Sequence, residues 1–220
     1  MPCVSTGRAG NPPGNQTACW LAAAAASVLL LMGGTAGAGE PVRSMLEMRR
    51  DNVVIQEWDL SCGAAALTTV LNQQFNDPVE EKEIAKALIS RQEYIDNPRL
   101  VQVRQGFSLL DLKRVAEARG YVGTGFGKMT VADLVERAPV LVPIMANGYN
   151  HFVIFRGQMA DRVLVADPAF GNYTMRIQKF ESAWIDYPAF GKVGFVVSAR
   201  DGRPPVNGLA PRPEEFVALR

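Results

Sequence analysis

Histidine is almost missing from this chain. The 220 residues contain one, His151, and only three cysteines, Cys3, Cys19 and Cys62. Any chemistry that pairs a thiol with an imidazole therefore has a single candidate imidazole. Zinc sites need three or four nitrogen, sulfur or carboxylate ligands, so this inventory argues against the usual metal centres. We expect neither a metal nor another cofactor.

An excess of charge is missing as well. The chain has 23 Lys and Arg against 22 Asp and Glu, for a formal net charge of +1. No basic field is available to hold nucleic acid or an anionic membrane surface. The Gly-rich stretch GTGFGK at residues 123–128 is not a phosphate loop, because Val122 replaces the first glycine and Met129 the final Ser or Thr. We interpret it as a flexible connection.

The first 39 residues contain one charged residue, Arg8. An uncharged apolar run, Trp20–Met32, is about as long as the core of a secretory signal and shorter than a membrane span of about 20 residues. The run is followed by the small residues Ala36-Gly37-Ala38, which form an A-x-A cleavage site. We predict a signal peptide over residues 1–38 and a periplasmic location. A retained membrane anchor is the alternative.

Removal of that segment would leave Cys62 as the only thiol. An exported protein with one cysteine has no internal disulfide to form. An unpaired thiol in an oxidising compartment is a liability, so its presence favours a chemical role. A buried structural cysteine is the alternative interpretation.

The hydrophobic pattern predicts helices first and strands second. Residues 39–51 read as a loose lead-in or a short helix, 52–200 as the main domain, and 201–220 as a Pro-rich, extended or disordered tail. Helices are expected at residues 62–75, 78–92, 108–120 and 130–139. Strands are expected at residues 52–56, 140–146, 151–157, 162–168, 173–178 and 192–199. A short helical turn is expected at residues 179–187 and a loop at residues 93–107. This order predicts an α+β fold, in which a helical half packs on an antiparallel sheet with a cleft between them.

Cys62 lies where an Ala-rich helix begins, between Ser61 and Gly63. The thiolate is the nucleophilic form of cysteine, and the unpaired N–H groups of a helix N-terminus favour it. Gly63 and the alanines after it would let a substrate backbone approach closely. His151, at the start of HFVIF, could act as the base of a Cys–His pair.

Two further residues complete this constellation. Asp167 ends the strand after the one that carries His151, so a hairpin would bring the carboxylate beside the imidazole. Gln56 precedes Cys62 by six residues, and its amide could stabilise an oxyanion together with the Cys62 N–H. Each residue has a plainer alternative, Asp167 as a turn residue and Gln56 as a surface strand residue. Asn150 could orient the ring instead of Asp167, although a loop amide is its plainer interpretation.

The segments QEWDLSCGAAAL and NHFVIFRG, followed by VLVADPAFGN, resemble the bacteriocin-processing peptidases. These are papain-like enzymes that cut leader peptides after a double glycine. The resemblance covers about residues 50–200 and implies that Cys62 is the nucleophile, His151 the base, Asp167 the orienting carboxylate and Gln56 the oxyanion donor. Ser61 departs from the family pattern, since many members have aspartate there.

An exported peptidase without a transporter resembles, in its architecture, the peptidases of functional-amyloid (Fap) secretion systems. The expected partner is then a peptide or protein substrate, such as an amyloid subunit or its secretion machinery. Gly63, Trp58, Tyr149 and Asn150 are the candidate substrate-binding residues. Two other functions stay open: a catalytically silent peptide-binding module that assists secretion, and a papain-like hydrolase or acyltransferase acting on other amides.

Overall fold

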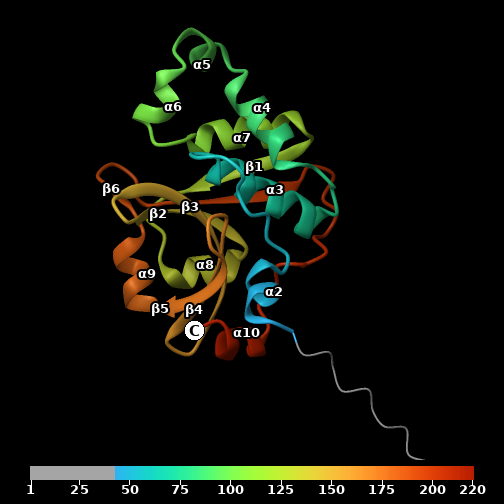
Figure 1. Ribbon diagram of the computed structural model, residues 1–220, viewed down its shortest axis with the longest axis vertical. Helices are drawn as coiled ribbons and strands as arrows, with labels where there is room; N and C mark the ends of the chain where they lie inside the picture. The colour runs from blue at the N-terminus through green and yellow to red at the C-terminus, as the bar shows by residue number, and fades with distance from the viewer. Residues whose placement is uncertain (1–42) are drawn as a thin grey trace, which may run out of the picture. The chain divides into compact units, whose positions relative to one another are not determined.

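An antiparallel sheet of six strands forms the centre of the fold, and Figure 1 shows helices above and below it. The computed structural model describes residues 43–220, which form one unit. The predicted signal peptide lies outside the described residues. The strand order is β1-β8-β2-β3-β4-β5. The strands are β1 (Tyr121–Phe126), β2 (Val140–Ala146), β3 (Tyr149–Met159), β4 (Arg162–Asp167), β5 (Gly171–Arg176) and β8 (Gly194–Ala199), and a separate pair is formed by β6 (Asp186–Tyr187) and β7 (Gly191–Lys192).

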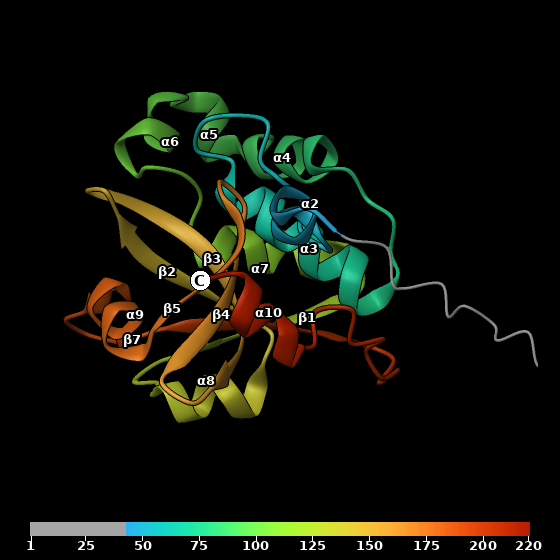
Figure 2. The ribbon, with the colours of Figure 1, turned by 60° about the horizontal axis from the view of Figure 1, so that its bottom comes forward.

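Two groups of helices cover the two faces of this sheet (Figures 1 and 2). The first group is α3 (Cys62–Phe75), α4 (Glu81–Ile89) and α7 (Leu109–Ala118); the second is α8 (Val131–Arg137) and α9 (Ile177–Ala183). Successive residues of a strand point to opposite faces. Accordingly Leu141 and Ile154 pack into the core under α3, whereas Val142 and Val153 pack into the core over α8 and α9. The expected α+β arrangement is confirmed.

The helix starts follow the sequence signals. Ser108 caps α7 by accepting a hydrogen bond from the Asp111 N–H, and the Asp111 carboxylate accepts one from the Ser108 N–H. Thr130 and Asp133 form the same reciprocal pair at the start of α8. Such pairs satisfy N–H groups that have no acceptor within the helix. Within residues 43–220, every helix is too short or too polar to cross a bilayer.

Three local predictions were wrong. The expected loop at 93–107 contains parts of two short helices, α5 (Gln92–Asp96) and α6 (Arg99–Val103), stabilised by the buried Tyr94, which donates to Asp111 at 2.6 Å. The Gly-rich stretch 123–128 largely belongs to β1, where Gly123 lies against the ring of Phe195. Residues 52–56 are not assigned to a strand.

The C-terminal prediction was also wrong. Residues 201–220 end in a helix, α10 (Pro213–Ala218), and Leu209, Phe216 and Leu219 are buried. The predicted lead-in forms a short helix, α2 (Met45–Arg50), which lies near α10 in Figure 1. Composition suggested disorder because prolines are frequent here, but three apolar side chains dock onto the sheet.

Candidate active site

Cys62 is the first residue of α3, and a tight turn delivers it there. The carbonyl oxygen of Trp58 accepts hydrogen bonds from the Ser61 hydroxyl at 2.7 Å and from Gln56 Nε2 at 3.0 Å. Leu60 adopts the left-handed conformation, with φ of 66°, which costs a non-glycine residue energy and is often found at functional sites. The turn therefore places the Cys62 thiol at a helix N-terminus, where N–H groups lack helical acceptors.

His151 lies on β3, and its imidazole is fixed by the carboxylate at the end of β4. Nε2 of His151 lies 2.7 Å from Oδ1 of Asp167. The ring is largely buried, with 11% of the side chain exposed. Because Asp167 occupies Nε2, the second ring nitrogen, Nδ1, is the one left for Cys62.

The charge state of His151 follows from these neighbours. Burial lowers the pKa of the imidazole, but hydrogen bonding to Asp167 and Cys62 and the charges of both groups outweigh it and raise the pKa from 6.5 to about 9. The imidazolium is thus the favoured form at neutral pH. A protonated imidazole beside a thiol stabilises the thiolate.

Asp167 is held by more than the histidine. It is buried, and Oδ1 also accepts from the N–H of Ala169 at 2.7 Å and of Phe170 at 3.3 Å. Oδ2 accepts from the hydroxyl of Tyr173 at 3.1 Å. Burial and the Asp167 charge raise the pKa of Tyr173, so this hydroxyl stays a donor. Asp167 also acts as a turn residue, the alternative that the sequence left open, since the same oxygen accepts the N–H groups of the turn into β5.

Gln56 reaches the same region from the segment before the turn. Its backbone N–H donates to the carbonyl oxygen of Pro168 at 2.8 Å. Its Nε2 donates one hydrogen to Trp58, which leaves the second amide hydrogen for another acceptor. Oε1 is buried and has no hydrogen-bond partner among the described residues. Gln56 and Cys62 line one cavity, as an oxyanion donor and a nucleophile must.

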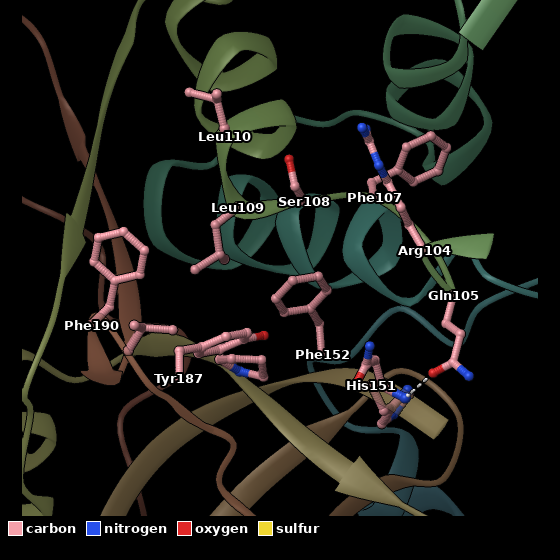
Figure 3. Close-up of a pocket in the computed structure, with 13 residues that line it drawn as sticks. Arg104, Gln105, Phe107, Ser108, Leu109, Leu110, His151, Phe152, Tyr187 and Phe190 are labelled. Carbon is pink, nitrogen blue, oxygen red and sulfur yellow. Dashed lines mark hydrogen bonds between the residues drawn. The ribbon is translucent and has the colours of Figure 1, made fainter. Parts of the chain in front are cut away.

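Two adjoining cavities meet at His151. One, of about 660 Å³, is lined by Cys62 and Gln56 and by Gln105, Tyr149 and Phe170. The other, of about 410 Å³, is mostly apolar (Figure 3), and Phe107, Leu109, Phe152, Tyr187 and Phe190 line it. Gln105, Asn150 and His151 line both.

Of the four predicted substrate-binding residues, two line the cavity of Cys62 and two do not. Tyr149 and Asn150 line the cavity of Cys62. Trp58 is exposed and lines a neighbouring cavity against α4. Gly63 is buried, and a Cβ there would lie 3.2 Å from the Phe152 ring, so this glycine permits close packing of α3 on β3 and does not face a substrate.

Sequence reasoning missed Gln105 and Tyr173. Gln105 fell in a segment read as a loop, so nothing indicated that it would reach β3. Tyr173 could have been found from the predicted hairpin, because a strand that returns beside Asp167 must place side chains near its carboxylate. Among residues 43–220, no group of three His, Cys, Asp or Glu side chains is arranged to hold a metal ion.

Comparisons with known proteins identify the family of this chain. The model of the Peptidase C39 family matches residues 50–191. A protein of Pseudomonas fluorescens named "Probable functional amyloid protease FapD" is 33% identical over 171 residues, which cover 71% of this chain and 74% of that protein. Its namesake in Pseudomonas aeruginosa PAO1 is 33% identical over 144 residues, 65% of this chain. The match spans 61% of the length of that relative.

Two solved structures share the fold. A double glycine motif protease from an AMS/PCAT transporter, solved with its leader peptide, has a TM-score of 0.51 at 20% identity and covers 66% of this chain and 89% of its own. The peptidase domain of Streptococcus ComA, a bifunctional ABC transporter, has a TM-score of 0.54 at 15% identity and covers 68% and 99%. The papain-like fold expected from the sequence is therefore confirmed.

Proposed function

This chain belongs to the peptidase C39 family of cysteine peptidases, and from that premise we propose that it is exported and cleaves a secreted protein through a Cys62–His151–Asp167 triad. The observation that carries the proposal is the 2.7 Å contact between His151 Nε2 and Asp167 Oδ1, which turns the other ring nitrogen toward the thiol at the start of α3. Nucleophile, base and orienting group then stand in the order that thiol catalysis requires.

The first half-reaction forms a thioester. The Cys62 thiolate attacks the carbonyl carbon of the scissile peptide, and the carbonyl electrons move onto oxygen. The second hydrogen of Gln56 Nε2 and the Cys62 N–H donate to that oxyanion. When the carbonyl re-forms, the carbon–nitrogen bond breaks, and the imidazolium of His151 gives its proton to the leaving amine.

The second half-reaction restores the enzyme. Neutral His151 removes a proton from water, and the resulting hydroxide attacks the thioester carbon. The carbon–sulfur bond breaks, the acid product leaves, and Cys62 returns as a thiolate beside the imidazolium. Asp167 stabilises the charged ring in both halves and does not itself exchange a proton.

The proposed substrate is a secreted protein, such as a functional-amyloid subunit or a component of its secretion machinery, cut at a Gly-rich site. The names of the two Pseudomonas relatives support a substrate from the amyloid system, and the similarity to a double glycine motif protease supports a Gly-rich cleavage site. We place the reaction in the periplasm, because residues 1–38 have the pattern of a secretory signal.

Hydrolysis of a decapeptide with a central Gly-Gly tests this function. The purified chain should cleave it, and Cys62→Ala should abolish turnover with an unchanged circular dichroism spectrum. Mass spectrometry of the wild-type protein mixed rapidly with a peptide ester should trap the thioester on Cys62. Full activity in Cys62→Ala would refute the mechanism. Binding of the peptide without turnover in the wild type would support the silent peptide-binding module instead.

A further inference from the structure

The strand that carries His151 has an unusual free edge beside the candidate active site. β2 pairs with β3 from Tyr149 to Phe155, but β4 pairs with β3 only from Ile154 onward. Among the described strands, β3 therefore has a neighbour on one side only over residues 149–153. The open edge of a strand presents backbone N–H and C=O groups that another chain can join.

A side chain occupies this edge. The backbone N–H of Asn150, directly before His151, donates to Oε1 of Gln105 at 2.9 Å. In an antiparallel ladder a residue directs its N–H to one edge, and this N–H goes to Gln105 and not to β2. A side-chain amide oxygen is chemically equivalent to the carbonyl oxygen of a peptide backbone. Gln105 thus takes the place that a backbone carbonyl of an added strand would take.

Gln105 is positioned for this contact by its own backbone. It follows α6 in the left-handed conformation, with φ of 57°, and Gly106 after it has φ of 123°. These two residues turn the chain sharply, and Gly106 N–H donates back to Val101 O at 2.8 Å. Figure 3 shows the Gln105 side chain reaching from this turn to β3 beside His151.

The contact also divides the cleft. The cavity of about 660 Å³ with Cys62 and the apolar cavity of about 410 Å³ are both lined by Gln105, Asn150 and His151. The Gln105–Asn150 hydrogen bond thus lies where the two cavities meet. A peptide long enough to extend from Cys62 into the apolar cavity would have to pass this bond.

We propose that Gln105 is a gate residue, whose side chain occupies the free edge of β3 until a substrate backbone carbonyl displaces it at the Asn150 N–H. This inference rests on the proposed function, because the displacing group is the backbone of the peptide substrate. Gln105 therefore competes with the backbone of a long substrate for the Asn150 N–H. It selects for peptides that bind β3 as an additional strand.

Two substitutions at Gln105 change the gate in opposite directions. Gln105→Met keeps the length of the side chain but cannot accept from Asn150, so the edge is left free. Gln105→Glu offers a charged acceptor, which forms a stronger hydrogen bond. Both variants keep a non-glycine residue at positive φ, so the backbone strain is matched. Gln178→Met, which alters an exposed residue of α9 outside the lining of both cavities, is the control.

The direct test is binding of a fluorescent decapeptide with a central Gly-Gly to the Cys62→Ala protein carrying each substitution. We expect Gln105→Met to lower the Kd about three- to tenfold, the range of one hydrogen bond, and Gln105→Glu to raise it. The control Gln178→Met should change the Kd less than twofold. The Asn150 amide should exchange with D₂O faster in Gln105→Met than in the wild type, and the peptide should restore its protection. A merely structural role of Gln105 would not produce this restored protection.

Three results overturn the gate: equal Kd values in all variants, weaker binding by Gln105→Met, or no binding by any of them. Hydrolysis measured in parallel with Cys62 intact separates the two proposals. Opposite shifts in Kd without hydrolysis would leave the gate standing and refute the peptidase function. Hydrolysis whose KM does not respond to Gln105→Met or Gln105→Glu would refute the gate and leave the peptidase function standing.

Discussion

The backbone N–H of Gln56 donates to the carbonyl oxygen of Pro168 at 2.8 Å. This bond joins the segment that leads to Cys62 with the segment that follows Asp167. The proposed nucleophile comes from the helical half and the proposed orienting carboxylate from the sheet, so a direct hydrogen bond between their neighbours fixes the distance across the site. It also presents the Gln56 side chain to the cavity of Cys62.

The role of Gln56 can be separated from the reactivity of the thiol. Gln56→Ala should lower kcat about 100-fold, because one oxyanion donor is lost, while the backbone bond to Pro168 remains. The rate of Cys62 alkylation by iodoacetamide should change less than twofold, since alkylation forms no oxyanion. Steady-state kinetics and labelling followed by mass spectrometry measure the two. A parallel loss of alkylation would show that Gln56 positions the thiol instead.

The carboxylate of Asp167 should control both the orientation and the charge of His151. Asp167→Asn keeps the shape but replaces the charged acceptor, so kcat should fall about 10³- to 10⁴-fold, by analogy with serine triads. The pKa of His151 should fall as well, because the Asp167 hydrogen bond and charge help to raise it. NMR titration of the single histidine measures that shift. A rate loss under tenfold would point to another orienting group such as Asn150.

Tyr173→Phe should lower kcat less than Asp167→Asn does. It removes one donor to Asp167 Oδ2, and the His151 contact to Oδ1 remains.

The ionised His151 should make the stability of the protein depend on pH. Its pKa is about 9 in the folded protein and about 6.5 in the unfolded chain. A raised folded-state pKa gives stability that is fully present below pH 6.5 and is lost as pH rises through 9. The free energy of unfolding of the wild type, minus that of His151→Gln, should therefore fall by up to about 3 kcal/mol between pH 6 and 10.

Urea unfolding at each pH measures this difference, and the subtraction removes the contributions of titrating groups that do not interact with His151. A difference that stays constant with pH would mean that the pKa of His151 is the same in the folded and the unfolded protein, and a difference that rises with pH would mean that folding lowers this pKa.

The residues of the proposed triad could be found from the sequence because they lie at the ends of regular elements. Cys62 begins a helix, and Asp167 ends a strand one hairpin away from His151, so periodicity alone places them at the edge between the two halves. With only one histidine in the chain, no other imidazole competed. The resemblance to double-glycine peptidases then supplied the roles.

The features that sequence missed depend on contacts between distant segments. Gln105 reaches Asn150 across 45 positions, and a polar residue in a turn between two helices gives no sign of such a partner. Gly63 was read from its lack of a side chain as a point of substrate approach. The same lack serves the packing of Phe152 and Leu112, and only the fold distinguishes the two uses.

The C-terminal segment offers the last test, because it is attached through a buried ion pair. Arg156 on β3 contacts Glu215 of α10 at 2.7 Å, and both side chains are 2% exposed. Arg156 also donates to Asn172 and to the carbonyl of Leu209, so strand, helix and tail are joined at one guanidinium.

Removing one partner of such a pair leaves a buried charge without compensation. Glu215→Ala should therefore lower the free energy of unfolding by about 3–5 kcal/mol. The double variant Arg156→Met with Glu215→Leu removes both charges and keeps the apolar volume, so it should lose less than Glu215→Ala alone. Urea unfolding of the wild type, Arg156→Met, Glu215→Leu and the double variant completes the cycle, and Glu215→Ala is measured beside them. A Glu215→Ala protein as stable as the wild type would mean that residues 201–220 are the loose tail that composition suggested. A large loss in Glu215→Ala that the double variant recovers would instead show that the tail belongs to the peptidase fold. Truncation near residue 200 would then expose the buried Arg156.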